Sequence, residues 1–137
     1  MSYHVDLRST DDALAFPSNT VTDFTVTLNP PLNLDTDYLW EVGMIDMYEN
    51  LNIAGAFVFN SDVVNHSRVG TSSLRSLIVY NPDDNFFDFT ASYVRVGKMN
   101  IANIRIYITD RQGKMLSLPT GVVRVHIHFR KVTPFNR

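Results

Sequence analysis

The chain has 137 residues, of which 45% are hydrophobic and 19% charged, and its formal net charge at pH 7 is −2. This length is enough to bury one core. With 12 basic against 14 acidic residues there is no excess of positive charge to neutralise phosphates, so we expect no direct nucleic-acid partner. The absence of cysteine excludes disulfides, thiolate catalysis and cysteine-type zinc sites.

Apolar and polar residues alternate with period two in three segments of the first part of the chain, 3–8, 23–29 and 38–48. Such alternation is typical of a strand that places one face on a core and the other toward water. The apolar positions are Tyr3, Val5 and Leu7, then Phe24, Val26 and Leu28, then Trp40, Val42 and Met44. The pattern predicts a strand in each segment.

A proline- and Asx-rich stretch over 29–37 separates the second and third of these segments. Pro30 and Pro31 lack the amide hydrogen that a sheet ladder needs, and the surrounding Asn and Asp residues favour turns. The sequence therefore predicts a corner here, which does not continue as a central strand.

The middle of the chain is less regular. A short apolar strand is expected over 55–60, and the polar, weakly patterned residues 61–73 indicate a surface loop. A further strand is expected over 74–80, closed by the dense turn signal of 81–85. Residues 86–96 hold four aromatics and indicate one or two short strands.

The last third of the chain alternates most strictly. Ile104, Ile106 and Ile108 share one face of an expected strand over 101–109, and a hairpin-type turn follows in which Gly113 can adopt positive φ. In the final strand the apolar face is Val123, Val125, Ile127 and Phe129, and the opposite face is Arg124, His126, His128 and Arg130. Residues 131–137 then form a tail that frays or docks on a neighbouring molecule.

About eight strands at even spacing, with no competing helix, predict an all-β chain. We expect a single antiparallel β-sandwich domain of jelly-roll type over 1–137. The N-terminal residues lack the continuous apolar core of a signal peptide, and the longest apolar runs are too short to span a membrane, so we expect no membrane span.

His126 and His128 form an H-x-H pair, which on a strand points both rings to one side at a spacing that suits two metal ligands. A cupin-like metal site needs further ligands from neighbouring strands. The other histidines, His4 and His66, lie in segments that give no reason to converge there, and the flanking arginines disfavour a cation. We therefore expect no metal and no cofactor, and interpret these residues as a polar outer face or a subunit contact.

Phe86, Phe87 and Phe89 are crowded into four positions, so at least one of them should point outward. For these three residues together with Tyr93, a core or subunit contact is the favoured interpretation, and a stacking platform for bases or sugars is the alternative. Phe135 in the tail is a further contact candidate. No catalytic residue is expected, because no G-x-S-x-G motif is present and the carboxylates Asp83, Asp84 and Asp88 match a solvated turn.

Motifs at both ends of the chain resemble those of capsid-associated proteins of Maverick/Polinton elements and related small DNA viruses. The first group is FPSNT at 16–20, FTVTL at 24–28, Leu32 and Leu34, and WEVG at 40–43. The second group is NIRIYITD at 103–110, Gly113, and VHIHFR at 125–130. The resemblance covers about half of the chain, and the middle is unmatched.

The resemblance implies a penton-like or minor capsid protein of the single jelly-roll type, without enzymatic activity. Its partners would be copies of itself, in a pentamer or a trimer, and other capsid proteins, and its location would be the virion, assembled inside the host cell. A receptor- or glycan-binding β-sandwich module on a virion surface is the second hypothesis. A cupin-like metal enzyme that uses His126 and His128 is a distant third.

Overall fold

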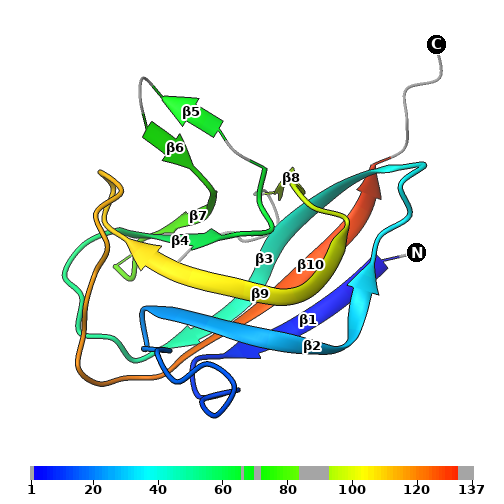
Figure 1. Cartoon of the computed structure of the whole chain (residues 1–137). Helices are drawn as coiled ribbons and strands as arrows, with labels where there is room; N and C mark the ends of the chain where they lie inside the picture. The colour runs from blue at the N-terminus through cyan, green and yellow to red at the C-terminus, as the bar shows by residue number, and fades with distance from the viewer. Residues whose placement is uncertain (1, 66, 70–71, 84–92, 133–137) are drawn as a thin grey trace.

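The computed structural model describes residues 2–65, 67–69, 72–83 and 93–132. These residues contain strands and connecting turns, and no helix (Figure 1). No helix in this described part is therefore long and apolar enough to cross a membrane. The strands are β1 (Ser2–Arg8), β2 (Asp23–Asn33), β3 (Leu39–Glu49), β4 (Phe57–Ser61), β5 (Ser67–Val69), β6 (Ser72–Leu74), β7 (Ser76–Tyr80), β8 (Tyr93–Arg95), β9 (Asn100–Thr109) and β10 (Val123–Val132).

Eight of the described strands form two four-stranded sheets with the orders β1-β10-β3-β8 and β2-β9-β4-β7. The pairing is nested and antiparallel: β1 pairs with β10, β2 with β9, β3 with β8 and β4 with β7. A long hairpin rolled up in this way gives the jelly-roll arrangement. The predicted all-β antiparallel sandwich of jelly-roll type is confirmed.

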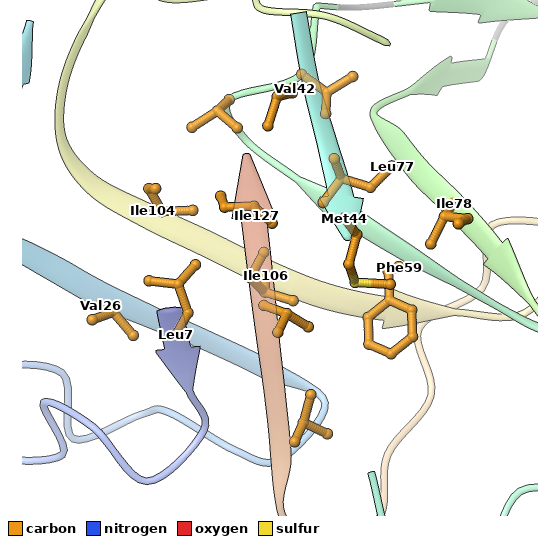
Figure 2. Packing of buried hydrophobic residues seen from close by; sticks show 14 of the residues in the cluster. Leu7, Val26, Val42, Met44, Phe59, Leu77, Ile78, Ile104, Ile106 and Ile127 are labelled. Carbon is orange, nitrogen blue, oxygen red and sulfur yellow. The ribbon is translucent and has the colours of Figure 1, made fainter. Parts of the chain in front are cut away.

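The core lies between the two sheets, where the predicted apolar faces meet. Figure 2 shows side chains of one sheet, such as Leu7, Met44 and Ile127, opposite those of the other, such as Phe59 and Ile106. The alternation predicted for β9 and β10 is confirmed, since their inward residues are completely buried. Burial of each such side chain contributes about 1.5–3 kcal/mol.

The corner predicted over 29–37 begins later than expected, because β2 continues through both prolines to Asn33. Pairing with β9 is interrupted between Thr27 and Leu32, where the register shifts. β2 is an edge strand of its sheet, so Pro30 and Pro31 need no partner on a second side. The prediction treated the prolines as a strand end, whereas an edge strand with a break in register accommodates them.

The surface loop predicted over 61–73 is also wrong in part. Ser67–Val69 and Ser72–Leu74 pair with each other as the two-stranded ribbon β5–β6, which projects beyond β4 and β7 (Figure 1). Strands of three residues are too short for a period to be recognised in the sequence. At the C-terminal end, Lys131 and Val132 pair with Trp40 and Leu39 within β10, so the strand extends into the predicted tail, and 133–137 lie outside the described residues.

Gly97 lies where main-chain hydrogen bonds join the two sheets. The Asn65 amide donates to the Arg95 carbonyl oxygen at 2.9 Å, and the Gly97 amide donates to the Val63 carbonyl oxygen at 2.7 Å. A Cβ atom on Gly97 would lie 2.9 Å from the Asn65 Cα, so the close approach of the two backbones requires glycine. This contact connects β8, in one sheet, to the segment that follows β4, in the other.

Candidate functional site

The outward face of the sheet β1-β10-β3-β8 carries polar side chains in rows that the strand register sets. One row runs from His4 to His128, then to Gly43, then to Tyr93. Adjacent rows hold the remaining outward residues of β10, because alternate residues of a strand share a face. All four polar residues predicted for the outward face of the last strand, Arg124, His126, His128 and Arg130, are brought together here.

Three histidines form the centre of this face, and we call His4, His126 and His128 the histidine cluster. The His4 Nδ1 and His126 Nε2 atoms are 3.1 Å apart, within hydrogen-bonding distance. The His4 ring also stacks on the His128 ring, with the ring centroids 4.4 Å apart and the planes inclined by 15°. His4 therefore contacts both histidines of β10 at once.

Tyr93 extends the histidine cluster toward the other edge of the sheet. Its hydroxyl oxygen lies 2.7 Å from His128 Nδ1. Gly43 stands between the two residues in the register and has no side chain, which leaves room for this contact over β3. The Arg130 guanidinium lies 3.6 Å from the centre of the Tyr93 ring, a distance typical of a cation–π interaction.

Burial, and next the neighbouring positive charges of His4, Arg130 and His126, lower the pKa of His128. Burial disfavours the charged form of an imidazole because water solvates that form better. The folded protein therefore favours a neutral His128. Histidine is the side chain whose charge most readily changes near neutral pH, so the charge of this face depends on pH.

Two ion pairs flank the histidine cluster. The Arg124 Nη2 atom lies 3.0 Å from a carboxylate oxygen of Asp6, and Arg130 Nη2 lies 3.1 Å from Glu41 Oε1. The hydrogen bond from Arg124 lowers the pKa of Asp6. All four side chains are partly exposed, so these pairs contribute little to stability, but they orient both arginines along the face.

The described residues contain no group of three or more His, Asp or Glu side chains arranged to hold a metal ion. In the histidine cluster the ring nitrogens of His4 and His126 face each other, and one nitrogen of His128 faces Tyr93. A pocket beside the cluster is lined by Asp46, Met47, Tyr48, Arg124 and His126. The arrangement suits polar contact with another surface.

The expectation that His4 does not converge on the H-x-H pair is wrong. β1 pairs with β10, and the register sets His4 directly opposite His128. Alternation in residues 3–8 already placed His4 on the polar face of its strand, but nothing in the sequence indicated which strand it would pair with. The sequence analysis grouped Tyr93 with the nearby phenylalanines, and its contact with His128 was missed for the same reason.

The remaining predicted contact residues, Phe86, Phe87, Phe89 and Phe135, lie outside the described residues, as does His66. Of the predicted acidic turn, Asp83 is described, and its amide donates to the Asn81 side chain at 3.0 Å, as in an Asx turn.

A second polar region lies where the β5–β6 ribbon meets the sandwich. It is a cavity of about 330 Å³ lined by Asp62, Val64, Asn65, Arg75, Gly97 and Lys98. The Asp62 carboxylate accepts hydrogen bonds from Lys98 Nζ and from the Arg105 amide, each at 3.0 Å. Asp62 thus serves to connect the segment after β4 with β9.

Comparison of the chain with family models, with curated proteins and with solved structures finds no match. The functional interpretation consequently depends on the fold, on the histidine cluster and its surroundings, and on the contacts between the motif residues.

Proposed function

We propose that this protein is a virion structural protein, a penton-like or minor capsid subunit that self-assembles and contacts neighbouring capsid proteins. The observation that carries the proposal is the nested pairing of the strands in the two four-stranded sheets, which gives the jelly roll. Jelly rolls are a common architecture of viral capsid domains, although they also occur in lectins and cupins. Fold alone does not determine function, so the motif residues carry the next step.

The motifs at the two ends of the sequence form one structural unit. FTVTL lies in β2, which pairs with β9, where most of NIRIYITD is located. WEVG lies in β3, which pairs with β10, the strand that holds VHIHFR. Segments about eighty residues apart in sequence are therefore neighbours in the fold, which supports treating them as one pattern and not as independent amphipathic strands.

Polar residues of the first motif group make specific contacts. The Asn19 side chain donates to the Thr25 carbonyl oxygen and accepts from the Thr25 amide, both at 2.9 Å, so it satisfies β2 as a neighbouring strand would. In WEVG, Trp40 and Val42 are buried, and Glu41 pairs with Arg130 of the second motif group. This ion pair thus joins one residue of the first motif group to one residue of the second.

The second motif group has an equally direct physical explanation. Asp110 Oδ1 accepts hydrogen bonds from the Gln112 and Lys114 amides, each at 2.9 Å. Gly113 adopts a φ of 89°, which glycine tolerates best. The T-D-x-x-G pattern therefore encodes the turn that ends β9.

A capsid subunit needs surfaces for its neighbours and no reaction centre. Identical copies that meet through two different faces close into a ring when the rotation permits it. Each stable contact would bury on the order of 1,000 Å². The polar face of β1-β10-β3-β8, with Arg124, His126, His128 and Arg130, is the proposed contact surface.

The test is the oligomeric state of the purified chain, measured by size-exclusion chromatography with light scattering and by electron microscopy of single particles. We expect a discrete ring, a pentamer or a trimer. His126→Ala should weaken the ring, whereas Thr27→Ala, an exposed position on the other sheet, serves as the matched control and should not. A monomer at all accessible concentrations would contradict self-assembly, and an unchanged ring in His126→Ala would remove this face from the contact.

The two other hypotheses have distinct signatures in the same preparations. A monomer that binds a glycan array would favour the receptor- or glycan-binding module. Stoichiometric iron, manganese or zinc in the purified protein would favour the cupin-like enzyme, although His126 and His128 lie on the outside of the sandwich and not between its sheets.

A further inference from the structure

The contact between His4 and His126 imposes a limit on their protonation. Of two imidazole nitrogens 3.1 Å apart, one must carry a hydrogen and the other a lone pair. When both rings are imidazolium, all four of their nitrogens carry hydrogens, and His4 Nδ1 and His126 Nε2 can no longer bond. Double protonation of this pair must therefore separate the two rings.

His4 cannot turn away from His126 without also affecting His128, because the two rings are stacked at 4.4 Å. With all three rings protonated, the positively charged His4 ring would contact two other positively charged rings, those of His126 and His128. His128 itself can keep its contact with Tyr93, because a tyrosine hydroxyl both donates and accepts. The strain of protonation falls on His4 and on the strand that carries it.

Several other charged or titratable groups face the histidine cluster. They are Asp6 and Arg8 on β1, Arg124 and Arg130 on β10, Glu41, Asp46 and Tyr48 on β3, and Tyr93 and Arg95 on β8.

The four arginines exceed the three carboxylates of this set by one charge, and protonation of three histidines raises the excess to four. Asp6 and Glu41 are already paired with Arg124 and Arg130. The carboxylates therefore do not compensate the added charge fully.

β1 is the element that can respond. It is an edge strand, and among the described strands it pairs with β10 alone. Its C-terminal half is anchored by the buried Leu7 and by the hydrogen bond from the Ser9 amide to the Val123 carbonyl oxygen at 2.8 Å. Its N-terminal half, Ser2 to Val5, contains no completely buried residue and places Tyr3 against Trp40, with ring centroids 5.7 Å apart.

We propose that His4, His126 and His128 form an acid-sensitive latch, which holds the N-terminal half of β1 against β10 at neutral pH and releases it when the cluster is protonated. Release withdraws Tyr3 from Trp40 and exposes the edge of β10 that pairs with β1 in the closed state. The latch belongs to the face used in the proposed function, but it operates within one chain and does not depend on assembly.

The linkage of protonation to stability has the direction that the latch requires. The pKa of His128 is lowered, first by burial and then by His4, Arg130 and His126. A depressed histidine contributes stability that is complete above its ordinary pKa and is lost as pH falls through the depressed value. Acid therefore weakens the closed state.

Two measurements on the full chain test the latch. Trp40 is the single tryptophan and is 2% exposed, so its emission spectrum reports directly on the cover that Tyr3 provides. Hydrogen exchange of the β1 amides, compared with those of β9, separates local release from global unfolding. Between about pH 7.5 and about pH 5 we expect a red shift of Trp40 and a loss of β1 protection of about tenfold, with β9 unchanged.

Two variants remove the titrating ring of β1 in different ways. His4→Phe keeps a flat ring to stack on His128, and His4→Gln keeps a hydrogen-bonding group; neither can gain a proton in this range. Both should show the same β1 protection at the two pH values. His66→Gln, which removes the fourth histidine, is the matched control and should respond to acid as the original chain does.

The latch would be overturned if the original chain showed no local response to acid, or if the His4 variants responded as the original chain does. Equal loss of protection in β1 and β9 would also overturn it. A His66→Gln variant that abolishes the response would overturn it as well. An independent check is the NMR titration of the His128 ring, whose pKa should rise in His4→Gln, because the charge of His4 lowers it. An unchanged titration would contradict the coupling.

Discussion

The outward faces of the two sheets differ in the kind of charge they carry. On β2-β9-β4-β7 the main pair is Arg105 with Asp23, joined by two hydrogen bonds of 2.8 Å, and the Arg105 guanidinium lies 4.3 Å from the centre of the Tyr107 ring. Donation of hydrogen bonds from Arg105 to the Asp23 carboxylate raises the pKa of Arg105 above its usual value, so this cation is permanent. On β1-β10-β3-β8 the centre is the histidine cluster, made of the side-chain type whose ordinary pKa lies closest to neutral pH.

The two faces also differ in how their polar groups are satisfied. On the β4–β9 side, Asn60 and Thr109 are almost completely buried. The side-chain amide of Asn60 donates to the Val58 and Tyr107 carbonyl oxygens and to Thr109 Oγ1, at 3.1–3.2 Å. In the histidine cluster the rings bond mainly to one another and to Tyr93. The comparison teaches that one core supports a fixed outer face on one sheet and a titratable one on the other.

The largest expected effect tests the part that the two sheets share. Ile106→Ala and Ile127→Ala each remove a completely buried side chain, one from each sheet. Each should lower the free energy of unfolding by about 2–5 kcal/mol in chemical denaturation. Leu14→Ala, at a fully exposed position, is the control and should have no measurable effect. A small loss in only one of the two core variants would show that the sheets do not share the core equally.

The next effect tests the main-chain link between the sheets. Gly97→Ala places a Cβ atom 2.9 Å from the Asn65 Cα, and the neighbour is backbone that cannot simply rotate away. We expect a loss of about 1–3 kcal/mol, as for overpacking, measured by thermal unfolding. Unchanged stability would indicate that this link adjusts without cost.

A smaller effect distinguishes the titratable face from the fixed one. Because the pKa of His128 is lowered in the folded state, its neutral form stabilises the fold above the ordinary histidine pKa, and this contribution is lost on acidification. His128→Gln should therefore flatten the dependence of unfolding free energy on pH between about 7 and about 5. Asp23→Asn, on the other sheet, should leave that slope unchanged. Equal slopes in all three proteins would contradict the distinction.

The smallest effects concern the exposed ion pairs. Asp23→Asn should cost up to about 1 kcal/mol at neutral pH, since both partners of the pair are partly exposed. For Asp6 the pKa is lowered by Arg124, so its contribution is present above its ordinary pKa of 3.8 and is lost as pH falls below it. Asp6→Asn should reduce the loss of stability in that acidic range. Denaturation curves at several pH values measure both effects.

The faces of the long strands could be predicted from the sequence, because alternation of residues depends only on the local chain. Ile104, Ile106 and Ile108 in β9 and the apolar residues of β10 point into the core as expected. Alternation puts Thr109, the residue after Ile108, on the polar face, yet Thr109 is buried and accepts a hydrogen bond from the Asn60 side chain. Alternation thus predicted correctly on which side of a strand each side chain lies, and it predicted the burial of the side chains less well.

Contacts between distant strands could not be predicted in the same way. His4 meets His128 because β1 and β10 pair across almost the whole chain, and the register of such a pair depends on the complete fold. The three-residue strands β5 and β6 were too short for a recognisable period. The break in register that lets β2 pass Pro30 and Pro31 likewise depends on its position at a sheet edge.

The nested pairing has a consequence for biosynthesis. β1 and β3 both pair with β10, and β2 pairs with β9, so the first three strands obtain these partners only after residues 100–132 have been translated. Contacts of such long sequence separation slow folding and leave unpaired strand edges exposed in the meantime. A nascent chain that stops before Val123 would present β1 and β3 without the strand that lies between them, and we expect it to require chaperone protection or to aggregate.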